Sequence, residues 1–146
     1  MHPFPHEYEV SAAASGERLT LRSGELAPIE SAAPAEFDGP GDKWSPETLM
    51  TAAVADCFIL TFKAVAAASR FEWENLECRV KATLDRVERV TRFTHFVVTA
   101  ELTVPAGTDE AQAVKLLEKS EANCLVANSL IAEVALEPSV VVSPGR

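Results

Sequence analysis

A long apolar segment, residues 49–68, is the feature that most limits how this chain can fold. We predict that it lies in one helix from about Pro46 to about Ser69. Ser45 is a favoured N-cap residue and proline is favoured at the first helical position, while Glu47 suits the positive end of the helix dipole. Because the middle of this helix is apolar on nearly every face, we expect it to be covered on all sides. A chain of 146 residues seldom covers so long a helix alone, so we expect a second copy of the chain to cover part of it.

The composition argues against a membrane or a nucleic acid as partner. Asp56 and Lys63 interrupt the apolar segment, which favours a buried helix over a membrane span. The net charge of −9 predicts a surface that repels phosphate groups. Residues 1–6 do not have the pattern of a secretory leader. The cysteine count of three is low and is an odd number, which argues against a disulfide framework. We therefore expect a cytoplasmic protein.

The remaining pattern predicts a single α+β domain over residues 1–146. Apolar residues make up 47% of the chain, enough for a buried core. Alternating polar and apolar residues, bounded by turn signals, predict the strands 7–14, 18–22, 25–30, 76–85, 93–104 and 134–142. A second helix is expected to start at a Thr108 cap and to run to about Ala122, with a short helical stretch over 125–130. The expected order is βββ-α-ββ-α-(α)-β.

The three cysteines are candidates for reactive side chains, and each also has an ordinary structural interpretation. Cys57 lies in the apolar helix, where a small buried thiol is the ordinary interpretation. Cys124 precedes a short helix, so it is either a packed residue or a thiol whose ionised form the free N–H groups stabilise. Cys78 falls on the apolar face of a strand, which predicts core packing.

Other chemistries have little support in the sequence. There is no Cys-x-x-Cys, and three scattered histidines do not form a metal-binding pattern, so we expect no metal. A Gly-x-Ser-x-Gly elbow and a glycine-rich phosphate loop are also absent from the sequence. No bound cofactor is expected.

Two sequence segments together are similar to a known family. Residues 37–50 (Phe-Asp-Gly-Pro-Gly-Asp-Lys-Trp-Ser-Pro-Glu-Thr-Leu-Met) lead into the helix and place Cys57 ten residues after Glu47. Residues 124–130 (Cys-Leu-Val-Ala-Asn-Ser-Leu) follow 67 residues after Cys57. Both resemble the motifs of the OsmC/Ohr family of thiol-dependent hydroperoxide reductases, and the order of elements agrees over residues 8–142.

The resemblance implies a mechanism for two of the cysteines. Cys57 would attack a peroxide oxygen and become a sulfenic acid, and Cys124 would resolve it as a disulfide. An external reductant, either a dithiol such as a lipoyl group or a small thiol, would then reduce that disulfide. Cys78 matches no position of the family and keeps its structural interpretation.

The resemblance also implies an arginine, held by a glutamate, that stabilises the thiolate. Glu47 matches the glutamate. Arg18 matches the arginine of the Ohr branch, since it lies ten residues after Tyr8 and two after Gly16. Arg22 is the alternative because strand register can slip, and a solvated charge at a strand end is the ordinary interpretation of Arg18.

Helix geometry limits the role of Glu47. Ten helical residues place it about 15 Å along the axis from Cys57, so it acts indirectly or on the cysteine of a partner chain. Family members form intertwined homodimers with sites at the interface, and the resemblance implies the same assembly here.

The sequence departs from both branches of the family. Glu36 stands where the OsmC branch has its arginine, and Leu125 stands where the Ohr branch often has proline. Five apolar side chains either line a pocket for organic hydroperoxides or belong to the core: Phe37, Trp44, Met50, Phe58 and Phe62.

We therefore expect a cofactor-free, homodimeric thiol peroxidase acting on organic hydroperoxides. Two alternatives stay open. One is a non-catalytic protein of this fold that binds a small apolar ligand at the dimer interface. The other is a redox sensor whose disulfide forms without turnover.

Overall fold

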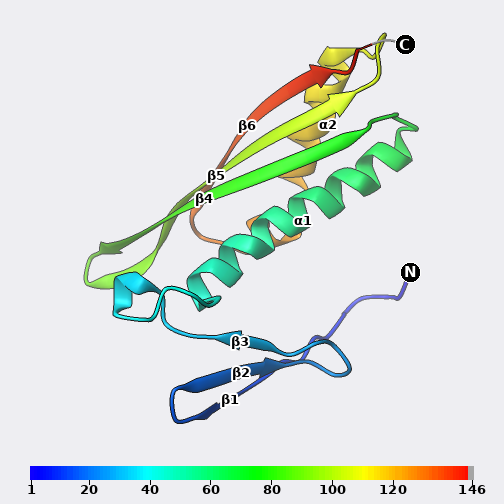
Figure 1. Cartoon of the computed structure of the whole chain (residues 1–146). Coiled ribbons are helices and arrows are strands. Elements are labelled where there is room, and N and C mark those ends of the chain that lie inside the picture. The colour runs from blue at the N-terminus through cyan, green and yellow to red at the C-terminus, as the bar shows by residue number, and fades with distance from the viewer. Residues whose placement is uncertain (145–146) are drawn as a thin grey trace. The chain divides into compact units, whose positions relative to one another are not determined.

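The computed structural model describes residues 1–144 and divides the chain into two compact units (Figure 1). The first unit is Met1–Met50 and the second is Thr51–Arg146. The prediction of a single domain stays a prediction.

The first unit contains a small antiparallel sheet. Its strands, in the order β1-β2-β3, are β1 (Ser11–Ser15), β2 (Arg18–Arg22) and β3 (Ile29–Ser31). A 3-10 helix, η1 (Ala35–Phe37), follows β3. Glycine at position 16 takes a φ of +61°, which closes the tight turn between β1 and β2.

The predicted strand over 18–22 is confirmed, whereas the predicted bounds of its neighbours are wrong. β1 begins only at Ser11 because its pairing with β2 starts there, opposite Arg22. β3 begins only at Ile29 because a turn closed by the hydrogen bond from Leu26 N to Ser23 O (3.0 Å) occupies the preceding residues.

The second unit is built on a three-stranded sheet in the order β4-β5-β6. Its strands are β4 (Asn75–Val87), β5 (Val90–Val104) and β6 (Glu133–Val142). β4 and β5 form an antiparallel hairpin, while β5 and β6 run parallel. The parallel pair needs a crossover connection, which α2 (Glu110–Ala122) and the short α3 (Leu125–Asn128) supply. The predicted order of helices and strands is confirmed.

The central helix α1 (Pro46–Ala68) begins as the sequence predicts. The Ser45 side chain caps it by accepting a hydrogen bond from Thr48 N at 3.1 Å. The predicted cap of α2 is wrong by one residue: Asp109 accepts from Ala111 N (3.0 Å) and Gln112 N (3.2 Å). The Thr108 hydroxyl instead donates to Pro105 O at 2.7 Å, so it is committed to the preceding turn.

The core of the second unit lies between one face of the sheet and two helices. α1 contributes the buried residues Val54, Phe58, Phe62 and Ala66, which recur at a helical spacing of four. β5 contributes the alternate residues Phe96, Val98, Ala100, Leu102 and Val104, and α2 contributes Ala113, Leu116 and Leu117. This packing fixes the rotation of α1 and therefore the direction in which its other side chains point.

The second unit buries one face of α1 in its core. Only the four residues named above are buried, and Leu60 is 57% exposed. By length and composition alone α1 is also the one described helix that could cross a membrane. The predicted cover on every side is therefore not provided by the second unit alone.

Candidate functional site

Two cysteines from distant parts of the sequence meet in the second unit. Cys57 is half-buried on α1, one residue before the core residue Phe58. Cys124 is buried, with 1% of its surface exposed, at the start of α3. The two thiols are hydrogen-bonded to each other, and both are in the reduced, free form. The structure thus brings together Cys57 and Cys124, two of the four predicted site residues.

The turn between α2 and α3 aims backbone donors at Cys57. Cys124 has an extended conformation (φ −68°, ψ 107°) at the N-cap of α3, so the chain changes direction there. The first N–H groups of a helix have no partner within that helix. Here the N–H groups of Leu125 and Val126 donate to the Cys57 sulfur.

Hydrogen bonding favours the ionised form of Cys57. Burial raises the pKa of this thiol. The opposing hydrogen bonds come from Val126 N–H, the Cys124 and Thr61 side chains, and Leu125 N–H, and together they bring the pKa below its usual value.

Cys124 has the opposite tendency. Burial raises its pKa first, and the hydrogen bond and negative charge of Cys57 raise it further. The N–H groups of Ala127 and Val126 lower this pKa without reversing the shift. Within the pair, Cys57 is therefore the thiol that ionises first, and Cys124 is the one that keeps its proton longer.

Cys78 is the third thiol of the second unit. It lies on β4 opposite Ala100 and packs against the core, as predicted. Burial, with a smaller contribution from the charge of Cys124, raises its pKa to about 11, so it stays protonated at neutral pH. Over residues 1–144 no group of three or more His, Cys, Asp or Glu side chains is placed to hold a metal ion.

Thr61 is a contact of Cys57 that the sequence analysis did not identify. Its hydroxyl donates to Cys57 O at 2.7 Å and lies 3.9 Å from Cys57 Sγ. Its spacing in the sequence could have indicated this contact, because a residue four positions after Cys57 lies one helical turn later on the same face.

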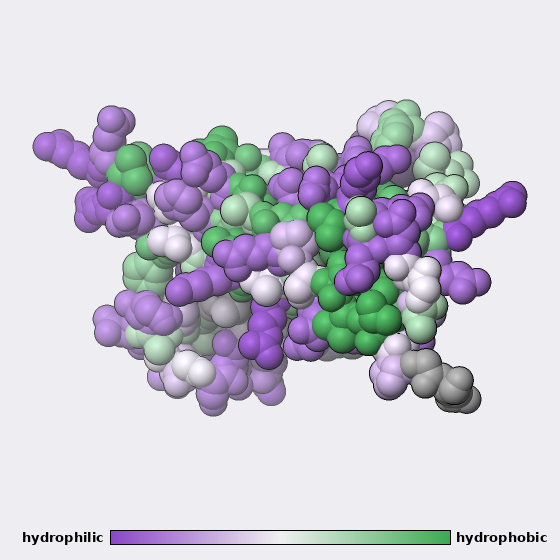
Figure 2. Space-filling model, turned by 90° about the horizontal axis from the view of Figure 1, so that it is seen from above, coloured by the Kyte–Doolittle hydropathy of each residue, from purple (hydrophilic) through white to green (hydrophobic). Residues whose placement is uncertain are grey.

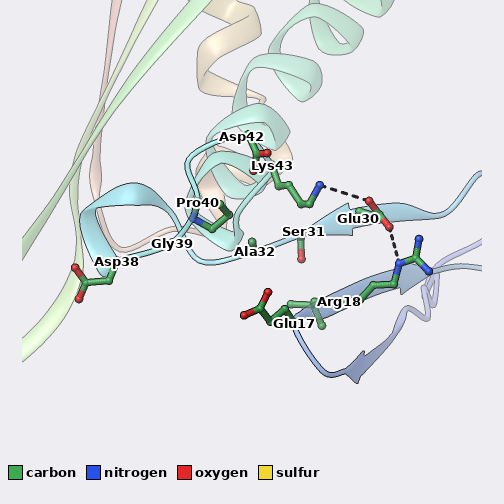
Figure 3. Close-up of a pocket in the computed structure, with 11 residues that line it drawn as sticks. Glu17, Arg18, Glu30, Ser31, Ala32, Asp38, Gly39, Pro40, Asp42 and Lys43 are labelled. Atoms are coloured by element: carbon green, nitrogen blue, oxygen red, sulfur yellow. Dashed lines mark hydrogen bonds and ion pairs between the residues drawn. The ribbon is translucent and has the colours of Figure 1, made fainter.

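Arg18 belongs to an ion-pair cluster in the first unit (Figure 3). Its Nε donates to Glu30 Oε1 at 2.8 Å, and Lys43 Nζ lies 3.6 Å from Glu30 Oε2. The hydrogen bond from Arg18 and the charges of both cations lower the pKa of Glu30. The three side chains line a pocket of about 860 Å³ formed wholly by first-unit residues.

The predicted roles of Arg18 and Glu47 toward Cys57 stay predictions. Glu47 is half-buried in the first turn of α1. The alternative, Arg22, lies exposed at the end of β2.

Two of the five residues that were candidates for an apolar pocket belong to the core instead. Phe58 and Phe62 are 1% and 0% exposed and pack in the core cluster, so the core interpretation is the right one for them. The side chains of Phe37, Trp44 and Met50 are exposed.

Comparisons with known proteins agree on one family. The family model described as OsmC-like protein matches residues 39–139. The uncharacterized protein YmaD of Bacillus subtilis is 27% identical over 96% of this chain and 97% of its own length. The peroxiredoxin OsmC of Escherichia coli is 28% identical over 64% of each chain. The structure of an OsmC-like protein of unknown function from Vibrio cholerae superposes with a TM-score of 0.84 at 20% identity, covering 92% of this chain and all of the other.

Proposed function

Because this chain belongs to the OsmC-like protein family, we propose that it is a thiol peroxidase that reduces organic hydroperoxides through Cys57. The observation that carries the proposal is the asymmetric pair of hydrogen-bonded thiols. One sulfur, that of Cys57, is surrounded by donors that favour its ionised form, and the other stays protonated beside it. A reactive thiolate next to a second thiol is the arrangement that reversible cysteine oxidation requires.

The proposed reaction proceeds in three balanced steps. The Cys57 thiolate attacks the terminal peroxide oxygen, so that an S–O bond forms, the O–O bond breaks and the alkoxide leaves to become an alcohol by taking a proton. The Cys124 sulfur then attacks the Cys57 sulfenic acid, and the S–O oxygen departs as water together with the Cys124 proton. An external dithiol reduces the disulfide by thiol–disulfide exchange and is itself oxidised to a disulfide.

The pKa order of the two thiols supports this assignment of roles. The residue that attacks first must be ionised, which favours Cys57. A resolving residue that stays protonated does not compete for the peroxide, and the raised pKa of Cys124 meets this condition. The proposed reaction uses no bound cofactor, and the reducing cytoplasm is where its dithiol would be available.

The test of the proposed function is turnover. We expect the protein to accelerate the consumption of cumene hydroperoxide by dihydrolipoamide in proportion to protein concentration, with hydrogen peroxide as the less efficient substrate. Consumption no faster than with the dithiol alone would contradict the proposal.

We also propose that the active form is a homodimer. α1 is apolar and incompletely covered, and the large apolar side chains Leu60, Leu125 and Ile131 are 57%, 69% and 85% exposed. Figure 2 shows hydrophobic side chains at the surface among hydrophilic ones. Burying an exposed apolar face is the usual driving force for association. Light scattering at micromolar concentration is expected to give twice the mass of one chain, and a monomeric mass would contradict the dimer.

A further inference from the structure

We propose that Thr61 is a further catalytic residue, whose hydroxyl donates a hydrogen bond to the ionised Cys57 sulfur and so keeps more of it reactive. The assignment rests on the proposed function of Cys57. Its basis is a direct contact with the reacting atom: Thr61 Oγ1 lies 3.9 Å from Cys57 Sγ. Both residues are half-buried on α1.

The single hydroxyl proton of Thr61 has two acceptors within reach, and the charge on Cys57 decides between them. When Cys57 is a thiol, the Thr61 hydroxyl donates to Cys57 O at 2.7 Å, and its oxygen can accept from the S–H. When Cys57 is a thiolate, the hydroxyl turns toward the sulfur, because a hydrogen bond to a charged acceptor is the stronger one. The carbonyl of Cys57 then loses one hydrogen bond but still accepts the helical N–H four residues later.

The carbonyl contact of Thr61 alone would be unremarkable. Ser and Thr hydroxyls in helices commonly bond the carbonyl four residues earlier. Ser120 in α2 does so with Leu116 O at 2.6 Å. The second contact, to the sulfur, sets Thr61 apart and makes Ser120 a matched control for the effect of the carbonyl bond.

The sulfur is thereby supported from two elements. Thr61 approaches it along α1, and the N–H groups of Leu125 and Val126 approach it from α3. The α3 donors depend on how the α2–α3 turn is placed. The Thr61 hydroxyl lies on the same helix as Cys57, so its contact is kept when that turn moves. Thr61 also favours Cys57 as the leaving thiolate when a dithiol attacks the disulfide at Cys124, because a more stable thiolate leaves faster.

The test measures Cys57 ionisation in reduced protein without peroxide. The rate of Cys57 alkylation by iodoacetamide is followed against pH by peptide mass spectrometry, in wild type, Thr61→Val, Thr61→Ser and Ser120→Ala. We expect Thr61→Val to move the Cys57 midpoint up by about one pH unit, which makes Cys57 about tenfold less reactive at pH values below both midpoints. Thr61→Ser keeps the hydroxyl and is expected to keep the wild-type midpoint. Ser120→Ala is expected to leave it unchanged.

Two results would overturn the assignment. One is a wild-type midpoint in Thr61→Val; Thr61→Ala provides the same measurement if the valine variant does not fold. The other is an equal shift in Thr61→Val and Thr61→Ser, because the hydroxyl would then not be the cause. A midpoint shift in Thr61→Val together with no peroxide consumption by wild type would support the Thr61 contact and contradict the proposed peroxidase.

Discussion

Replacing Cys57 by serine is expected to lower the rate of cumene hydroperoxide reduction by at least about a thousandfold, to the background of the dithiol alone. The serine hydroxyl has nearly the shape of the thiol but is not ionised at neutral pH, so no nucleophile remains to attack the peroxide. The fold is expected to survive, because the core side of α1 consists of other residues, among them Phe58 and Phe62. The measurement is steady-state peroxide consumption, with thermal unfolding by circular dichroism as the check on folding.

Cys78→Ala is the matched control for the loss of a thiol. Cys78 packs against the core and has a pKa of about 11, so it contributes no thiolate at neutral pH. We expect this variant to keep the wild-type rate. Peroxide reduction that persists in Cys57→Ser, or that is lost equally in Cys78→Ala, would contradict the assignment of Cys57. A folded Cys57→Ser variant that still binds a small apolar ligand, in a protein whose wild type does not turn over, would favour the ligand-binding alternative.

Replacing Cys124 by serine is expected to stop the reaction after its first step. The serine hydroxyl can still donate a hydrogen bond to Cys57, which preserves one of the donors around the thiolate. It cannot form a disulfide, so one equivalent of peroxide is expected to leave Cys57 as a sulfenic acid. Intact-mass spectrometry should show the addition of one oxygen atom, and dimedone should label Cys57.

The steady-state rate shows whether Cys124 is needed for turnover. With dihydrolipoamide as the dithiol, the Cys124→Ser variant is expected to lose most of its steady-state rate. A wild-type rate would mean that the dithiol reduces the sulfenic acid directly and that Cys124 does not resolve it. Disulfide formation in wild type without any turnover would instead favour the redox-sensor alternative.

Local signals in the sequence predicted much of the fold. The start of α1 follows from Ser45, whose side chain does cap the helix, and from the proline after it. Bounds that depend on pairing were harder to predict. The β4–β5 hairpin extends to Val87 and Val90 because Glu88 and Arg89 both take positive φ values, a turn conformation that their residue types do not suggest.

The site was predictable only in part, because its contacts are tertiary. Nothing local links Cys57 with Cys124 across 67 residues, and only the family resemblance paired them. The N–H donors of Leu125 and Val126 depend on where the turn after α2 places α3. The ion pair of Arg18 with Glu30 was missed because the predicted strand bounds did not give the β2–β3 register, in which Thr20 faces Glu30.

Disulfide mapping is the direct test of whether Cys57 and Cys124 form one redox pair. Reduced wild-type protein is treated with one equivalent of cumene hydroperoxide, its remaining thiols are alkylated in acid, and its peptides are analysed without reduction. We expect one linkage, between the Cys57 and Cys124 peptides, with Cys78 alkylated. Recovery of Cys57 as an unmodified thiol, or linked to any residue other than Cys124, would contradict it.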